Sequence, residues 1–400
     1  MLKNDEFQKN NTVDLIKSGT YFAKLSTAIG AAKERIYFHT YIFSDDFTGN
    51  AIANELMNSA RKGIKVFLLI DGFASRQLPK IILQNFINSG IEVVLFEPLF
   101  KSKDFYFGRR MHQKVIVIDE NIAFIGGMNI ADRYNNRPEQ KAWLDFAVEV
   151  KGNVVTEIAN YCKEFWKSDC KTHTAKEIEK TKVVNNFFVV PQEDCLARIR
   201  INDWIRHRNE VSNTYIQLFK NARKDIYILC SYFIPGRAIR RQIVSASKKG
   251  IKIKIVMAGK SDVPIAKYAE RWLYDWLLRN KVVIYEYQPN VLHGKIAVSD
   301  ELMVTIGSYN VNNISTYASL EMNLDIMNKH FAQKVKSEID NIVLNDCIQI
   351  TNEIHKKRKN AAKQFSRWVS YQTIRLLFFV FTFYFKRKKS ITINPLNKRH

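Results

Sequence analysis

His112-Gln-Lys-Val-Ile-Val-Ile-Asp119 and His293-Gly-Lys-Ile-Ala-Val-Ser-Asp300 are two copies of one pattern, HxK(x)4D. After each aspartate, a pair of small residues and then an asparagine follow at nearly the same spacing, so that the asparagine lies 17 residues after the histidine in both copies. These residues are Gly126, Gly127 and Asn129 in the first copy and Gly307, Ser308 and Asn310 in the second. One such pattern could arise by chance, but two copies in step indicate a duplicated functional unit.

Each copy is predicted to lie on a buried strand. The residues after the lysine, 115–118 and 296–299, are apolar and mostly β-branched, which is typical of a buried strand. Residues i and i+2 of a strand point to the same face, so each histidine should lie beside the lysine of its own copy, Lys114 or Lys295. Lysine binds phosphate as a point charge, and histidine can act as base, acid or nucleophile near neutral pH.

The two copies together predict one composite site. Two histidines, two lysines and two asparagines would surround a space the size of a phosphate group. One histidine could attack phosphorus while the other protonates the leaving oxygen, and the lysine and asparagine side chains could stabilise the equatorial oxygens. On this basis neither a metal ion nor another cofactor is expected.

The flanking sequence also repeats, which predicts the fold class. Three pairs of segments match between the halves: 36–43 with 226–233, 62–66 with 249–253, and 93–97 with 282–286. Within each half, helical patterns alternate with apolar runs, which favours a largely parallel or mixed sheet with helices on both faces. We predict an α/β protein of two α/β/α sandwich half-domains, related by a pseudo-twofold axis, with the active site at their interface. The predicted boundaries are 1–190, 191–353 and a C-terminal tail, 354–400.

Composition places few further limits on function. The 400 residues, 46% of them hydrophobic, can form two substantial cores. The five cysteines form no CxxC pair, which favours free thiols in a reducing compartment. The polar N-terminal stretch predicts neither a secretory leader nor a transmembrane helix.

The tail concentrates the excess positive charge of the chain. The net charge is +23, and residues 354–400 hold 13 lysines and arginines but no acidic residue. An apolar, aromatic run at 376–385 is followed by the basic cluster 386–389; ten residues are too few to span a bilayer. The pattern favours binding to an anionic membrane surface, with a final helix docked on the protein's own core as the alternative. Nucleic acid is not expected as a partner, because the charge lies beside an apolar run.

The paired motifs resemble those of the phospholipase D superfamily, whose members form a phosphohistidine intermediate. The resemblance covers most of residues 20–345 and is strongest to bacterial cardiolipin synthases of the phospholipase D type. It rests on five further stretches: 41–49, 118–129, 142–145, 231–235 and 319–323. The chain differs from that family at Leu144, where an arginine is usual, and at Ser231, where a proline is usual.

The resemblance assigns roles to individual residues. It implies catalytic roles for the His, Lys and Asp of both motifs, with a preference for His112 as the nucleophile. It also implies phosphate binding by Asn129, Asn310 and Ser308. Two carboxylates, Asp145 and Glu321, would each orient an active-site histidine across the interface between the halves, and a carboxylate on the second ring nitrogen fixes the tautomer of a histidine.

The function that the resemblance implies is phosphatidyl transfer. Cardiolipin would form from phosphatidylglycerol and a second phospholipid, through a phosphatidyl-histidine. The alternative is a phosphodiesterase of the same superfamily that hydrolyses phospholipid or nucleic acid. The chain resembles the shorter, peripherally bound forms, so the expected location is the cytoplasmic face of a bacterial membrane, with the tail as a membrane-binding segment that takes no part in the chemistry.

Overall fold

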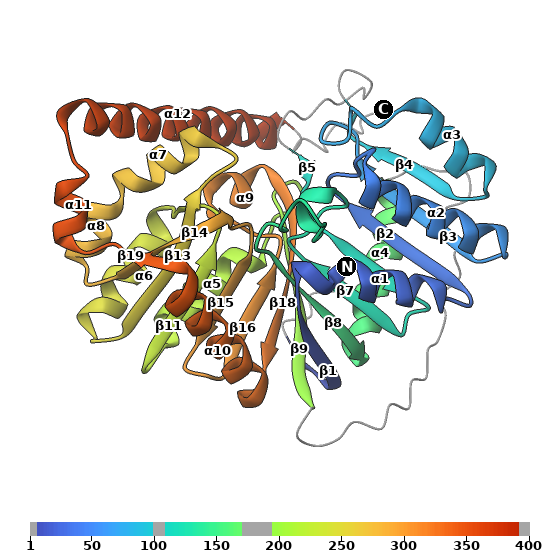
Figure 1. The fold of residues 1–400 in the computed structure, drawn as a ribbon, viewed down its shortest axis with the longest axis horizontal. Helices are drawn as coiled ribbons and strands as arrows, with labels where there is room; N and C mark the ends of the chain where they lie inside the picture. The colour runs from blue at the N-terminus through green and yellow to red at the C-terminus, as the bar shows by residue number, and fades with distance from the viewer. Residues whose placement is uncertain (1–5, 99–108, 170–193, 392–400) are drawn as a thin grey trace, which may run out of the picture.

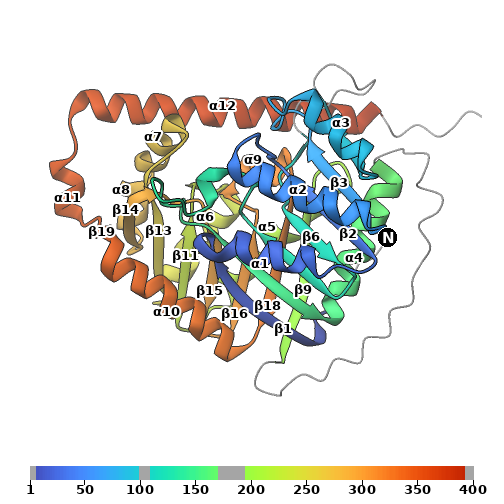
Figure 2. The ribbon, with the colours of Figure 1, turned by 45° about the vertical axis from the view of Figure 1, so that its right-hand side comes forward.

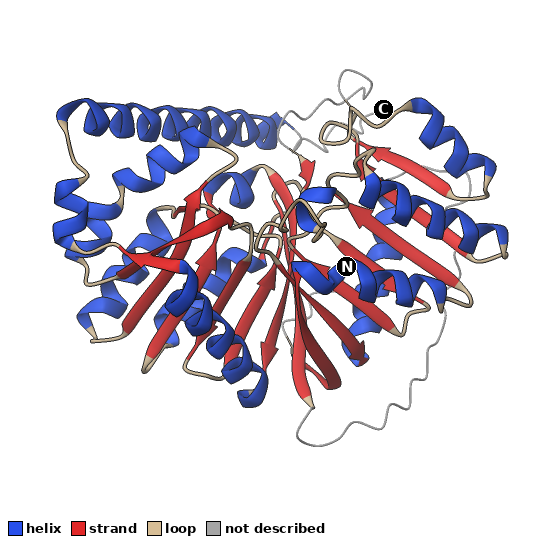
Figure 3. Ribbon diagram, in the orientation of Figure 1, coloured by secondary structure: helices blue, strands red, loops and turns tan. Residues whose placement is uncertain are grey.

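The structure, a computed structural model, describes residues 6–98, 109–169 and 194–391; side chains are described as far as residue 379, except that of residue 314. Cys170 and the predicted boundary between residues 190 and 191 lie outside the described residues. Helices and strands alternate throughout, and the two halves lie side by side (Figure 1 and Figure 3).

The first half contains eight strands and four α-helices. In chain order they are β1 (Gln8–Lys17), α1 (Ser18–Gly30), β2 (Arg35–Thr40), α2 (Phe47–Arg61), β3 (Lys65–Asp71), α3 (Lys80–Asn88), β4 (Glu92–Phe96), β5 (Arg110–Met111), β6 (Val115–Ile118), β7 (Ile122–Gly126), β8 (Phe146–Gly152) and α4 (Asn153–Asp169), with the short helix η1 (Asp132–Tyr134) before β8. The motif strand β6 is fully buried, as its four β-branched residues predict.

The second half repeats this order, with short additions. Its elements are β9 (Cys195–Asp203), β10 (Arg208–Asn209), α5 (Glu210–Asn221), β11 (Asp225–Cys230), β12 (Phe233–Ile234), α6 (Arg237–Lys248), β13 (Lys252–Lys260), α7 (Pro264–Trp272), α8 (Tyr274–Arg279), β14 (Val283–Val291), β15 (Lys295–Ser299), β16 (Met303–Gly307), β17 (Val311–Asn312), α9 (Asn313–Tyr317), β18 (Ser319–Met327) and α10 (Lys329–Asp346). After these come β19 (Cys347–Gln349), α11 (Asn352–Lys357) and α12 (Ala361–Ile391).

The strand pairings follow the same order in both halves. In the first half they run β4-β3-β2-β6-β7-β8-β1, and in the second β14-β13-β11-β15-β16-β18-β9. The three outer strands of each half are parallel and the others antiparallel, so the sheets are mixed. The terminal strands β1 and β9 pair with each other and join the halves. The predicted fold class, two related α/β/α half-domains, is confirmed.

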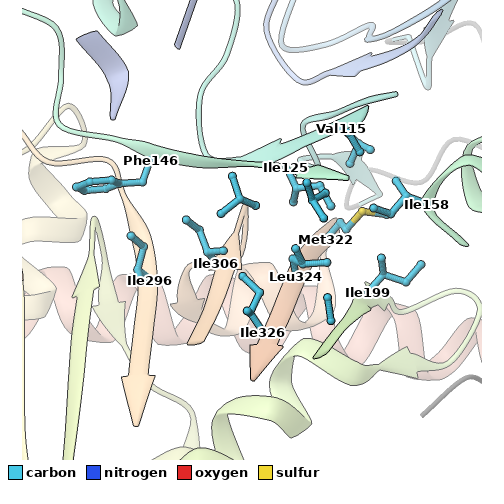
Figure 4. Packing of buried hydrophobic residues seen from close by; sticks show 14 of the residues in the cluster. Val115, Ile125, Phe146, Ile158, Ile199, Ile296, Ile306, Met322, Leu324 and Ile326 are labelled. Atoms are coloured by element: carbon cyan, nitrogen blue, oxygen red, sulfur yellow. The ribbon is translucent and has the colours of Figure 1, made fainter. Parts of the chain in front are cut away.

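A single hydrophobic core joins the inner faces of the two halves. Phe146 of β8 faces Ile296 and Ile306 of the other half (Figure 4), and α4 and α10 contribute to the same cluster. The outer faces carry separate clusters, one under α1, α2 and α3 and one under α5, α6 and α8. The shared core therefore fixes how the two motif strands lie relative to one another.

The strands that open each half, β1 and β9, were not predicted. The first begins with the polar stretch Gln8–Asn11, and the second carries Arg198 and Arg200, so neither shows the apolar pattern that is typical of a buried strand. Both arginines are nevertheless buried, because each forms an ion pair with Asp325 of the neighbouring strand β18. Pairing of this kind makes burial of a charge tolerable, and single-sequence patterns do not reveal the partner.

The tail begins with two helices that pack on the second half. The helix α12 lies along α7 at the top of the molecule (Figure 1 and Figure 2). Ile374 and Phe378 of α12 are buried against Leu273 and Ala269, and Arg240 donates a hydrogen bond to the Tyr371 hydroxyl at 3.1 Å. The inner face of α12 is therefore docked on the protein, which is the alternative to membrane binding given above. No helix within the described ranges is both long and apolar enough to cross a bilayer.

Candidate active site

Each motif histidine lies beside a strand from the opposite half. β5, which ends at Met111, pairs with the start of β18, so that Met111 lies opposite Leu320. In the related contact Leu144 pairs with Leu292, and the backbone N–H of His293 donates to the Leu144 carbonyl at 2.7 Å. The residue after each of these partners is a carboxylate, so the crossing places one carboxylate next to each histidine.

The two carboxylates contact the histidines as the resemblance implies. Nδ1 of His112 lies 2.9 Å from Oε2 of Glu321, and Nδ1 of His293 lies 2.6 Å from Oδ2 of Asp145. Both carboxylates are fully buried. A hydrogen bond at Nδ1 holds the ring in place and leaves Nε2 as the nitrogen for chemistry.

The two motif lysines complete a buried cluster of positive charge. Lys114 and Lys295 each donate to the backbone carbonyl of the histidine of their own motif, and Nζ of Lys295 also lies 3.1 Å from Nδ1 of His293. Burial lowers the pKa of Lys114 to about 7. The negative charge of Glu321 opposes this shift, and the positive charge of Lys295 adds to it. Burial likewise lowers the pKa of Lys295. A phosphodiester placed here would favour the charged form of both lysines.

The histidines share this electrostatic environment. Burial lowers the pKa of His112, and Lys114 adds to the effect, while Glu321 opposes it. The pKa of His293 is lowered further, by burial and by both lysines. Its partner Asp145 has a pKa raised by burial to about 7. At neutral pH the neutral imidazole of His112 therefore predominates, and this is the form that can attack phosphorus.

The two motif aspartates lie apart from this cluster, which corrects the prediction that they are catalytic. Asp119 follows β6 directly, at the end of this strand that is opposite His112. Its carboxylate accepts hydrogen bonds from three consecutive backbone amides, 33–35, ahead of β2. Asp300 does the same for amides 223–225 ahead of β11. Both residues fix the register of the motif strand.

The predicted phosphate-binding residues differ in what they contact. The amide of Asn129 is used within the protein, because it accepts from the Ile42 backbone and donates to the Tyr134 hydroxyl at 2.9 Å. Ser308 donates to Glu321 at 2.5 Å. These two residues therefore hold other parts of the site. Asn310 lines the cavity beside His112 and accepts from the Ser231 hydroxyl through Oδ1, so its side-chain nitrogen can face a substrate.

The departure from symmetry at Gly127 has a steric reason. A Cβ atom at this position would lie 2.4 Å from Oδ1 of Asp145. In the other half, Ser308 occupies the equivalent place and its hydroxyl binds the carboxylate of Glu321. Gly127 thus leaves room for the carboxylate that holds His293.

Replacing Gly127 by alanine is expected to displace Asp145 and to lower kcat/KM by about 10- to 100-fold, the usual cost of losing an outer partner of a functional histidine. Steady-state kinetics with thermal unfolding would measure this. The matched control is Gly30→Ala, because a Cβ atom at Gly30 meets nothing within 4 Å. Unchanged kinetics in a folded Gly127→Ala protein would show that His293 does not depend on the position of Asp145.

Several aromatic residues around the histidines were not singled out from the sequence. The Tyr41 ring lies 4.9 Å from the ring of His112, and Nζ of Lys114 lies 5.1 Å from the same tyrosine. Tyr134 and Trp143 lie 5.3 and 6.1 Å from His293. Tyr41 occupies the position of the repeat that Ser231 has in the second half, and this equivalence is the signal that could have identified Tyr41.

A cavity of about 330 Å³ opens beside His112. Its polar lining includes Arg110, His112, Asn310 and Glu321, and most of its exposed lining is apolar. Within the described residues, no group of three or more His, Cys, Asp or Glu side chains is arranged to hold a metal ion. The side chains present can bind a phosphate group, hold two imidazoles in defined tautomers and bury an apolar substituent next to them.

Comparisons with known proteins agree with this geometry. The family model described as "Cardiolipin synthase, PLD-like domain" matches residues 25–166 and 215–343, which is more than half of the chain. Cardiolipin synthase B of Escherichia coli K12 is 29% identical over 366 residues, with 88% of this chain and 85% of the relative covered. A cardiolipin synthase of Halalkalibacterium halodurans is 30% identical over 316 residues, covering 78% of this chain and 62% of the relative.

Solved structures confirm the fold. The crystal structure of phosphatidylserine synthase from Haemophilus influenzae superposes with a TM-score of 0.73, at 13% sequence identity, over 94% of this chain and 97% of that chain. Polyphosphate kinase from Porphyromonas gingivalis gives a TM-score of 0.57 at 15% identity, over 92% of this chain and 53% of that one. At these identities the likeness establishes the arrangement of the two halves.

Proposed function

The chain belongs to the family of cardiolipin synthases with a phospholipase D-like domain, and from this premise we propose how its site makes cardiolipin. The enzyme is a phosphatidyltransferase that acts on phospholipids. We propose phosphatidylglycerol as the phosphatidyl acceptor and a second phospholipid, which can also be phosphatidylglycerol, as the donor. The observation that carries the proposal is the crossed pair of contacts, His112 to Glu321 and His293 to Asp145, around one cluster of lysines.

In the first half-reaction, Nε2 of His112 attacks the phosphorus of the donor. The bond from phosphorus to the headgroup oxygen breaks, and that oxygen takes a proton from the protonated form of His293, which the negative charge of the bound phosphodiester favours, as the headgroup alcohol leaves. The product is a phosphatidyl group bound to His112. Glu321 stabilises the positive charge that develops on the attacking ring, because its carboxylate lies on Nδ1.

In the second half-reaction, His293 removes the proton from a glycerol hydroxyl of phosphatidylglycerol. The hydroxyl oxygen then attacks phosphorus, the bond to His112 breaks, and cardiolipin leaves. Lys114 and Lys295 stabilise the equatorial oxygens in both steps, together with Asn310. If water attacks instead, phosphatidic acid forms, so water exclusion decides the ratio of the two products.

The proposal is tested by mass spectrometry of lipids after the purified protein acts on phosphatidylglycerol vesicles, with and without phosphatidylethanolamine. Cardiolipin with release of glycerol is the expected result. Phosphatidic acid as the sole product would make the protein a hydrolase. Cleavage of DNA, with no turnover of lipid, would support the alternative of a nuclease.

We propose that the outer face of α12 lies on the membrane. Its exposed large apolar side chains, together with two from α7 and one from Val263 just before α7, form what we call the apolar ridge. The members are Val263, Ile265, Tyr268, Phe365, Trp368, Val369, Leu376, Leu377 and Phe379. Lys363 and Arg375 are exposed on the same helix, and each would contribute about 1 kcal/mol close to an anionic leaflet. This arrangement supports a peripheral enzyme on the cytoplasmic face of a bacterial membrane.

Replacing Leu376, Leu377 and Phe379 together by glutamine is expected to weaken binding to anionic vesicles by about tenfold or more, because these half- to two-thirds-exposed side chains lose the apolar area that would enter the bilayer. Vesicle sedimentation measures the change. The matched control is Leu344→Gln, a highly exposed leucine on α10 outside the ridge. If the triple variant sediments with vesicles like the unmodified protein, the membrane-binding surface lies elsewhere.

A further inference from the structure

The cavity beside His112 has a second wall that comes from the tail. Ile374 and Phe378 of α12 line it together with His112 and Asn310. Both apolar side chains are 7% exposed, and they pack with Ile234 and Leu273 of the second half. The tail therefore reaches the active site, although it had been expected only to bind the membrane.

The cavity has the polarity of one part of a phospholipid. Its lining includes polar groups that can bind phosphate, among them Arg110, His112 and Asn310, and an apolar set formed by Ile234, Val263, Ala266, Ile374 and Phe378. Val263 is exposed and also belongs to the apolar ridge, so the apolar lining of the cavity reaches the surface that we propose to face the bilayer. A lipid whose phosphate lies at His112 would pass from a polar to an apolar environment along this path.

We propose that Ile374 and Phe378 bind the first methylenes of an acyl chain of the phospholipid whose phosphate is at His112, which makes α12 a wall of the substrate-binding site. The inference rests on the proposed function, because it takes the substrate to be a phospholipid. About 330 Å³ is near the lower end of the range for small-molecule sites, about 300–1,000 Å³. The site therefore holds part of one lipid, and the remaining chain lies along the ridge and in the bilayer.

Polar contacts away from the cavity fix the position of α12. A helix that forms one wall of a binding site needs such a fixed position. Arg240 holds Tyr371, one turn before Ile374. Lys359, just ahead of α12, donates to Asp275 of α8 at 2.6 Å, and Arg358 donates to the buried Glu286 at 3.2 Å. These polar contacts orient the helix, so the side chains at 374 and 378, four residues apart, face the cavity together.

The test uses water-soluble phosphatidylglycerols with two butanoyl or two octanoyl chains, below their micelle concentrations, so that membrane binding plays no part. For the unmodified protein, kcat/KM should rise with chain length by about fourfold for each methylene that enters the cavity. Phe378→Trp fills the cavity and should abolish most of this rise. Leu344→Trp, an exposed position on α10, is the matched control and should keep the rise.

Total consumption of the donor is recorded together with the split between cardiolipin and phosphatidic acid. If only phosphatidic acid forms but the rise with chain length is lost in Phe378→Trp, the acyl site is supported and the proposed transferase function fails. Ile374→Phe enlarges another side chain of the same wall and so narrows the cavity. This variant replaces Phe378→Trp in the test if thermal unfolding shows that Phe378→Trp is not folded. An unchanged rise in a folded variant of the wall would overturn the proposal and leave α12 as a docked membrane-binding helix.

Discussion

Replacement of either His112 or His293 by alanine is expected to lower turnover by roughly 10⁴-fold or more, because nucleophile and proton donor act as a unit and neither can replace the other. The structure gives the physical reason: each ring is held at Nδ1 by its own carboxylate from the opposite half, so each presents only Nε2. The loss would be measured as cardiolipin formed per unit time by folded protein.

The double variant should be no slower than the slower of the two single variants, because removal of one member already disables the unit. His330→Ala is the matched control, since His330 is exposed on α10 and belongs to neither motif. Retention of a tenth of the activity by either single variant would mean that one histidine suffices.

Replacement of the carboxylates without change of shape, Asp145→Asn or Glu321→Gln, is expected to lower kcat by roughly 10²- to 10⁴-fold. The amide still occupies the space but cannot balance the charge that develops on the imidazole. Neither change should lower the thermal unfolding midpoint by more than a few degrees, whereas kcat should fall much more than KM rises. Glu164→Gln, at an exposed position of α4, is the matched control.

The pH profile shows whether Glu321 controls the protonation of His112 or only supports the fold. The negative charge of Glu321 raises the pKa of His112 against the stronger lowering by burial. Loss of that charge in Glu321→Gln should lower the pKa of His112 further. The nucleophile must be neutral, so the acidic limb of kcat/KM, which reports the free enzyme, should move to lower pH. A limb that does not move would show that Glu321 and His112 are not coupled.

The composite site could be predicted from the sequence because its main determinants are local. Spacing within each motif places His112 beside Lys114 and His293 beside Lys295, and repetition of the motif indicates two halves. The crossed carboxylates came from the resemblance, and the structure shows both contacts. Their catalytic importance is a proposal that the variants above test.

Other features depend on partners that are distant in the chain. Asp119 and Asp300 belong to the motif. They lie at the end of the motif strand that is remote from the histidines, where they bind backbone amides. The arginines of β9 are buried only because Asp325 lies on the adjacent strand. For α12, the apolar run was visible in the sequence, but which face packs on α7 depends on the shape of the second half.

The central claim is that His112 becomes covalently bound to the phosphatidyl group while His293 transfers protons. It is tested most directly with phosphatidyl 4-nitrophenol, whose leaving group departs without protonation and therefore needs no acid in the first step. On the proposed mechanism, His293→Ala should release about one equivalent of 4-nitrophenol in a burst and then stall. After an alkaline quench, mass spectrometry should find the phosphatidyl group on the peptide that contains His112, and His112→Ala should show no burst. A burst in His112→Ala with the label on His293 would reverse the assignment, and turnover without any covalent label in any of the proteins would contradict the mechanism.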